Sequence, residues 1–275
     1  MSHNSTLVVH AGGIRRSREE LGRLHTPPPT ATWKPVPHGE LVSELINGLD
    51  ARGITVARDE YCTMGRDNAK LLGTLDLRIP DLDTPEFGMG LGLRGANDRS
   101  MSIQVVAAAR VFVCDNWAFS GSDGAVFLRK KHTRRLDLSA VVPPAIDQFL
   151  ERAGAFRLDL ERMRGFSLSD WRAKELIHDA FSGPDAVAPL RLFPVVSRLY
   201  FVDEEQRARF PDRSLWSLNN AFTEAVKILK HCPQHAAGLR VGRMFGRILR
   251  REWHQLQPTA GFDEFNQNVA VHEVA

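Results

Sequence analysis

The spacing of the apolar residues changes once along this chain, and the change divides it into two structural halves. Between residues 54 and 128 apolar side chains recur at every second position, as at Leu75 and Leu77, which is the spacing of strands. Beyond Ser139 they recur at helical spacing, in segments separated by proline and glycine. The pattern predicts an α+β protein with a curved antiparallel β-sheet core, an N-terminal helix and a largely helical C-terminal half.

Three regions follow from this division. Residues 1–37 combine arginines with a stiff, proline-rich run, which predicts an extended basic N-terminal arm. Residues 38–138 are the predicted α+β core, and they begin with a helix in which Leu41 and Leu49 share one face. Residues 139–275 are predicted to be a helical region that packs on the core within the same domain.

The strands and helices can be placed from the same spacing and from the turn residues between them. The stretch 65–68 suits the turn of a hairpin, and the glycines at 88, 90 and 92 leave one face of a strand bare. Strands are expected at residues 54–63, 71–79, 88–93, 101–114 and 125–128. Helices are expected near residues 139–153, 156–181, 185–199, 203–209, 214–231 and 235–254.

Composition limits the class of protein. With 43% hydrophobic and 25% charged residues and a net charge of +3, the 275-residue chain has the makeup of a folded globular protein. Its start lacks the pattern of a secretory signal, and no apolar run approaches the roughly 20 residues that span a bilayer. The odd set Cys62, Cys114 and Cys232 fits a reducing compartment. We therefore expect a cytoplasmic protein without membrane partners.

Several short sequence strings follow one another along the chain in a characteristic order. They are Pro35-Val36-Pro37-His38, Leu72-Gly73-Thr74-Leu75, Leu93-Arg94 with Asp98 and Ser100, Val111-Phe112-Val113-Cys114-Asp115-Asn116, His132-Thr133 and Leu215-Trp216-Ser217-Leu218-Asn219-Asn220-Ala221. Together, over residues 33–232, they resemble the phage/plasmid-like family of prokaryotes known as domain of unknown function 932. The resemblance implies a mobile-element setting and no assigned chemistry. Gly95 and Ala96 stand where that family usually has Asn and Ser, so a polar role at these positions is not expected.

Two basic clusters are candidates for binding phosphate. The first follows the last strand and comprises Arg129, Lys130, Lys131, His132, Arg134 and Arg135. The second is a stripe about 100° wide on the last long helix, formed by Arg240, Arg243, Arg247, Arg250 and Arg251. Such groups suit phosphate contacts, although surface helices also carry arginines for solubility and ion pairing.

Polar and aromatic residues near strand ends complete the candidate nucleic-acid surface. Arg94, Asn97 and Asp98 mark a turn that either presents polar groups to a ligand or is an ordinary Asx turn. Trp117 and Phe119 follow the buried strand in a loop-like stretch and are candidates for stacking on bases. The other aromatic residues beside the sheet, Trp33, Tyr61 and Phe87, are expected in the core.

An enzymatic alternative uses Cys114 as nucleophile, His132 as base and Asp115 as the group that orients the base. A cysteine among apolar residues at a strand end is usually inert, which weighs against this arrangement. No cysteine or histidine spacing matches a metal site, so neither a metal nor a cofactor is expected.

The leading hypothesis is a non-catalytic nucleic-acid-binding protein that favours single-stranded DNA. By analogy of fold outline alone, it is similar to phage single-strand-annealing recombinases, and a homo-oligomer is then expected. A protein-interaction module that modulates a host or mobile-element partner is the remaining alternative.

Overall fold

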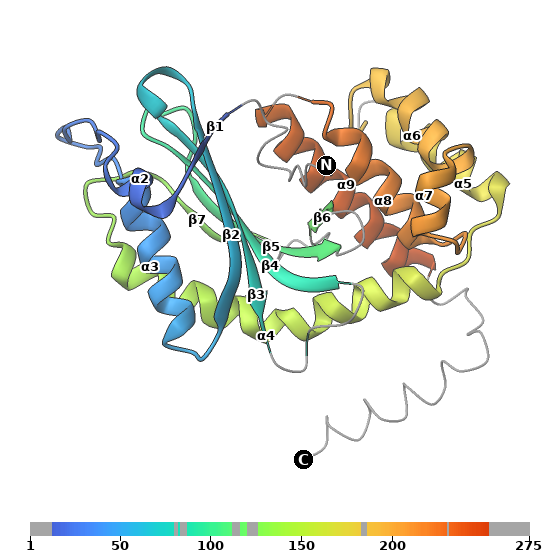
Figure 1. Ribbon diagram of the computed structural model, residues 1–275, viewed down its shortest axis with the longest axis horizontal. Helices are drawn as coiled ribbons and strands as arrows, with labels where there is room; N and C mark the ends of the chain where they lie inside the picture. Colours follow the sequence, from blue (N-terminus) through green and yellow to red (C-terminus); the bar gives the residue numbers. More distant parts are fainter. Residues whose placement is uncertain are drawn as a thin grey trace, which may run out of the picture.

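The computed structural model describes residues 13–79, 82, 87–111, 116–119, 126–182, 186–229 and 231–252. Within these residues a curved antiparallel sheet is flanked by helices on one face and by a group of helices at one end (Figure 1). The α+β architecture expected from the residue spacing is confirmed.

The sheet has seven strands. They are β1 (Ile14–Arg16), β2 (Thr55–Met64), β3 (Lys70–Arg78), β4 (Phe87–Ala96), β5 (Ile103–Val111), β6 (Asn116–Phe119) and β7 (Val126–Lys130). Strands β1 to β6 are neighbours in sequence order, and every pairing is antiparallel. Both β6 and β7 lie on the same edge of β5, β6 along its C-terminal end and β7 along its N-terminal end.

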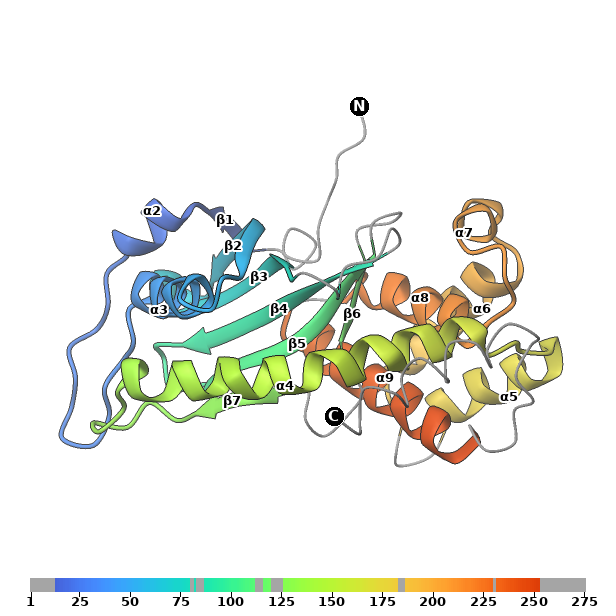
Figure 2. The same cartoon turned by 90° about the horizontal axis from the view of Figure 1, so that it is seen from below.

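Helices cover the sheet and form the second half of the chain. They are α2 (Arg18–Gly22), α3 (His38–Asp50), α4 (Leu138–Gly165), α5 (Asp170–Phe181), α6 (Phe193–Phe201), α7 (Glu204–Arg209), α8 (Leu215–Val226) and α9 (His231–Glu252), with 3₁₀ turns at Arg66–Asn68 and Leu190–Leu192. Figure 2 shows α4 running along the sheet and on into the group formed by α5 to α9.

Strand register decides which residues face the core and which face away from it. Leu93, Val105 and Leu128 stand opposite one another on β4, β5 and β7, and all three are buried in the main core with α3 and α4. The neighbouring positions on the same strands therefore point to the other face, because successive side chains alternate. That second row holds Arg94, Gln104 and Arg129.

The extended arm expected for residues 1–37 is corrected over residues 14–22, which form a strand and a helix. Ile14–Arg16 pairs with β2, and Arg18–Gly22 forms a short helix. Ser17 accepts a hydrogen bond from the Glu20 N–H, while the Glu20 carboxylate accepts one from the Ser17 N–H. This capping box stabilises the start of a helix. The helix could not be predicted from the sequence, because the prolines and arginines around it favour an extended segment.

Two further boundaries differ from expectation. The helix break expected near residue 154 is absent: α4 continues to Gly165, with Gly154 on its exposed side. The loop-like stretch expected to carry Trp117 and Phe119 is instead a strand, β6, paired with the end of β5. Four residues are too few for the alternating pattern to reveal a strand.

Candidate functional site

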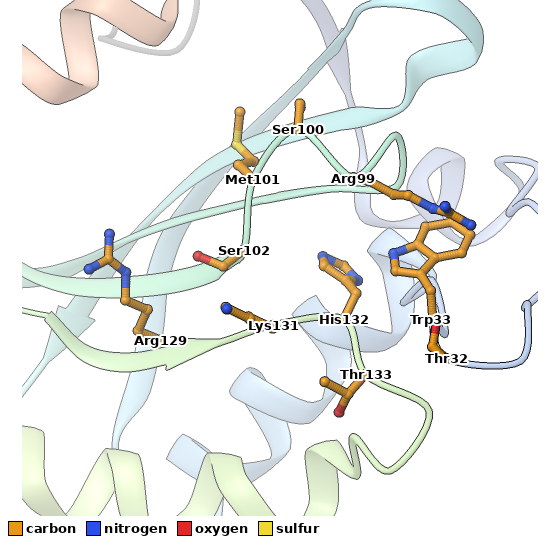
Figure 3. A pocket seen from close by; sticks show the side chains of 10 residues that line it. All are labelled: Thr32, Trp33, Arg99, Ser100, Met101, Ser102, Arg129, Lys131, His132 and Thr133. Atoms are coloured by element: carbon orange, nitrogen blue, oxygen red, sulfur yellow. The ribbon is translucent and has the colours of Figure 1, made fainter.

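A pocket of about 780 Å³ opens where the N-terminal segment, the β4–β5 turn and the end of β7 meet (Figure 3). It combines residues that are far apart in the sequence. The lining residues are Thr32, Trp33, Arg99, Ser100, Met101, Ser102, Arg129, Lys131, His132 and Thr133. The volume lies within the range of about 300–1,000 Å³ that is usual for ligand sites.

The N-terminal wall of this pocket is held against the segment that follows β7. Trp33 and Thr133 form an isolated antiparallel bridge, and the Lys34 N–H donates to the His132 carbonyl at 3.3 Å. These backbone contacts place the indole of Trp33 beside the imidazole of His132, with ring centroids 6.5 Å apart and planes tilted by 42°.

The β4–β5 turn supplies the opposite wall. Asp98 accepts a hydrogen bond from the Ser100 N–H at 2.9 Å, and its other oxygen lies 3.8 Å from Lys70 Nζ. Arg99, between them, adopts a left-handed backbone conformation with φ of 65°. Its guanidinium carbon lies 4.8 Å from the centroid of the Trp33 ring, so the turn directs a cation over the indole.

Asp98 is thus the accepting residue of an ordinary Asx turn. Burial tends to raise the pKa of its carboxyl group, but the hydrogen bonds from Ser100 and the charge of Lys70 together lower it. Asp98 is not among the residues that line the pocket, so the structure does not place it where it would contact a ligand there.

His132 and Trp33 present polar groups without partners. His132 is 8% exposed, and neither of its ring nitrogens is hydrogen-bonded; Trp33 Nε1 is buried and also unpaired. Burial lowers the pKa of His132. The nearby Lys34 backbone raises this pKa to a smaller extent, and the charge of His38 lowers it further. A buried polar group without a partner costs about 1–3 kcal/mol, so a ligand that satisfies these groups gains affinity.

The lining is positively charged. Arg99, Arg129 and Lys131 are exposed, and no aspartate or glutamate is among the ten lining residues. Within the described residues, none of the three cations forms an ion pair, whereas most other arginines near the sheet do, Arg15 with Glu60 for example. The pocket therefore offers uncompensated positive charge to an anion.

Arg94 and the remaining residues of the first basic cluster are not among the lining residues of this pocket. Arg94 Nε donates to Gln104 Oε1 at 2.8 Å, and Gln104 is opposite Arg129, so Arg94 belongs to the same row on the sheet. Lys130 is exposed at the end of β7. Arg134 and Arg135 are exposed but outside the lining.

Asn97 does not face the pocket. It is 5% exposed, and both ends of its side-chain amide are hydrogen-bonded to the backbone of Val36. The structure therefore gives Asn97 a structural role in place of the ligand contact considered from the sequence.

The second basic cluster lies elsewhere. Arg243 and Arg247 are exposed on α9, and Arg240 Nε donates to the Val187 carbonyl at 2.7 Å; the side chains of Arg250 and Arg251 are outside the described residues. Helix α9 contacts β6 (Figure 1), which pairs with the C-terminal end of β5, whereas the pocket residue Arg129 lies opposite Gln104 near the N-terminal end of β5. At about 3.3 Å per residue, the two ends of the nine-residue strand β5 are roughly 26 Å apart.

The enzymatic candidates are only partly visible. Cys114 and Asp115 lie outside the described residues, as do the side chains of Trp117 and Phe119. The described Cys62 is buried, and burial raises the pKa of its thiol to about 12, which leaves it protonated and unreactive. Among the residues that the structure describes, no three His, Cys, Asp or Glu side chains cluster as a metal site would require.

Two pocket residues could not be assigned from the sequence. The sequence predicts Trp33 in the core, and Arg99 lies in no motif that indicates a role. Their proximity depends on the pairing of Trp33 with Thr133, which no local pattern could show. A tryptophan within a proline-rich stretch, flanked by Thr32 and Lys34, was the available signal.

No protein-family model matches the chain, and comparison with curated proteins and with solved structures found no significant similarity. In the described part of the chain no helix is both long and apolar enough to cross a membrane.

Proposed function

We propose that this protein binds single-stranded nucleic acid, with the pocket around Trp33 and His132 as the site that receives one nucleotide. One observation carries the proposal. Three cations without ion pairs surround the buried His132 ring and the half-buried Trp33 ring, whose nitrogens lack partners within the described residues, in a pocket that has no carboxylate in its lining. Phosphate suits the cations, and a base suits the rings.

The chemistry favours an unpaired base. A neutral imidazole has one donor and one acceptor. The edge of a nucleobase also carries both donors and acceptors, so it matches the imidazole better than a bare phosphate does. The bases of a duplex are stacked and paired, so only a single strand or a strand end can place one in the pocket. The phage or plasmid setting implied by the family resemblance agrees with this function and forms part of the proposal.

Fluorescence anisotropy with labelled single- and double-stranded oligonucleotides over a salt series tests the proposal. Single strands should bind more tightly than duplexes, with affinity that falls steeply as salt rises. The double variant Arg129→Ala/Lys131→Ala should reduce the slope of log K against log salt by about 1.4, because each lost single-strand phosphate contact contributes about 0.7.

The matched control is Arg134→Ala/Arg135→Ala, which removes the same charge from the same segment outside the pocket lining. It should leave most of the slope in place. Equal losses from both double variants would show that general charge, and not the pocket, attracts the strand. No binding at low salt would refute nucleic-acid binding altogether and favour the protein-interaction alternative.

A further inference from the structure

A second, smaller cavity lies in the helical half of the chain. It has a volume of about 90 Å³, and its walls come from the end of α6, from α7, and from the segment that leads into the first turn of α8. The lining residues are Leu199, Tyr200, Gln206, Arg207, Phe210, Pro211, Arg213 and Ser217.

Two buried polar groups in this lining have no partner. Tyr200 is 4% exposed with its hydroxyl unpaired, and Gln206 is 6% exposed with its Nε2 amide unpaired. Nε2 can only donate, and burial raises the pKa of Tyr200, so its hydroxyl also keeps a proton to donate. The Ser217 hydroxyl donates to the Ser214 carbonyl and accepts from the Ser214 N–H, and together Ser217 and Arg213 only partly offset the effect of burial on the pKa of Tyr200.

Two guanidinium groups add positive charge to the same lining. Arg213 Nη1 donates to the Tyr200 carbonyl at 2.7 Å, and Arg207 donates to the Phe201 carbonyl. The carbon of the Arg213 guanidinium also lies 4.9 Å from the Tyr200 ring centroid, which fixes its position. The nearest acidic partner, Asp170, binds Arg213 at 3.4 Å, is 61% exposed and does not line the cavity.

The size of the cavity limits its occupant. An apolar cavity of about 150 Å³ holds benzene, so a cavity of about 90 Å³ suits a molecule of roughly five heavy atoms. A space lined by donors and cations, without carboxylates, selects for negative charge among molecules of that size. Phosphate has the required charge, size and acceptor oxygens.

We propose that this cavity is an oxyanion site that binds phosphate through Tyr200, Gln206 and Arg213. The site is separate from the pocket around Trp33. Binding of free phosphate there does not depend on the proposed function, whereas binding of a strand's phosphodiester rests on it. The phosphate could be a free ion or a phosphodiester of a bound strand, since both present the same oxygens.

The test compares the full chain in inorganic phosphate and in chloride at equal ionic strength. Phosphate should raise the Tm in a saturable manner and shift the side-chain amide resonance of Gln206 in NMR spectra. Gln206→Glu keeps the side-chain shape but adds a carboxylate, and it should abolish the Tm increase. Tyr200→Phe should weaken apparent phosphate affinity several-fold while leaving the fold intact.

Labelled oligonucleotide distinguishes the two sources. If Gln206→Glu also weakens oligonucleotide binding, the oxyanion is a phosphodiester; if only the phosphate response is lost, it is the free ion. Lys131→Ala, in the other pocket, is the control and should keep the phosphate response. An equal Tm increase in wild type and Gln206→Glu, or no Gln206 resonance shift, would show that only water fills the cavity and would overturn the proposal.

Discussion

Asn97 holds the backbone of Val36 at two points. Its Oδ1 accepts from the Val36 N–H at 3.1 Å, and its Nδ2 donates to the Val36 carbonyl at 2.9 Å. The Asn97 N–H in turn donates to the Ala69 carbonyl at 2.7 Å. One buried side chain therefore ties the β4–β5 turn to the segment that carries Trp33, so both walls of the pocket depend on it.

Replacing Asn97 should destabilise the fold. Asn97→Ala leaves the buried N–H and carbonyl of Val36 without partners, and we expect the free energy of unfolding to fall by about 2–4 kcal/mol. Urea unfolding followed by circular dichroism measures the change. The neighbouring Asp98→Ala, on the exposed turn, should cost less than about 1 kcal/mol. Similar costs for the two variants would contradict the structural role assigned to Asn97.

The sequence gives Asn97 and Asp98 the same signal, because both are turn-forming polar residues. Their roles diverge through partners: Asp98 bonds within its own turn, whereas the partner of Asn97 is 61 residues away. The β2–β3 hairpin and α3 could be predicted because their evidence is local, in residue spacing and turn residues. The pocket could not, because it depends on a bridge between Trp33 and Thr133.

Two glycines should respond to alanine in opposite ways. A Cβ on Gly73 would lie 2.7 Å from Tyr61 Cδ1 and 3.0 Å from Leu93 Cγ, both in the core, so Gly73→Ala should cost about 1–3 kcal/mol. A Cβ on Gly154 meets nothing within 4 Å, and Gly154→Ala in α4 should gain about 0.5–1 kcal/mol. Thermal and urea unfolding measure both. Destabilisation by Gly154→Ala would contradict a continuous α4.

Stability should depend on pH through two buried histidines. Burial lowers the pKa of His38 and of His132 in the folded state, so the unfolded chain takes up protons more readily below about pH 6.5. Stability is therefore complete above about pH 6.5 and is lost as the pH falls below it. Each extra proton bound by the unfolded state contributes a slope of about 1.4 kcal/mol per pH unit.

His132→Asn should reduce this slope and leave the part due to His38. Urea unfolding between about pH 5 and 8 measures it for both proteins. Carboxylates with lowered pKa, such as Asp98 and Asp147, titrate below about pH 4 and lie outside this window. An unchanged slope in the variant would mean that His132 exchanges protons equally well in both states.

Trp33 should contribute to nucleic-acid binding through its ring. Its indole lines the pocket beside His132, and stacking of a base on an aromatic side chain is worth about 1–3 kcal/mol. Trp33→Ala should therefore weaken single-strand binding about 5- to 150-fold in anisotropy titrations, with little change in the salt slope because no charge is removed. Trp171 is 71% exposed on α5, far along the chain from the pocket, and Trp171→Ala is the matched control with no expected effect.

Since Arg99 already covers one side of the Trp33 ring, Arg99→Ala should differ from Trp33→Ala by lowering the salt slope. If Trp33→Ala binds as tightly as wild type, the strand does not enter the pocket and the basic residues act only as a surface patch.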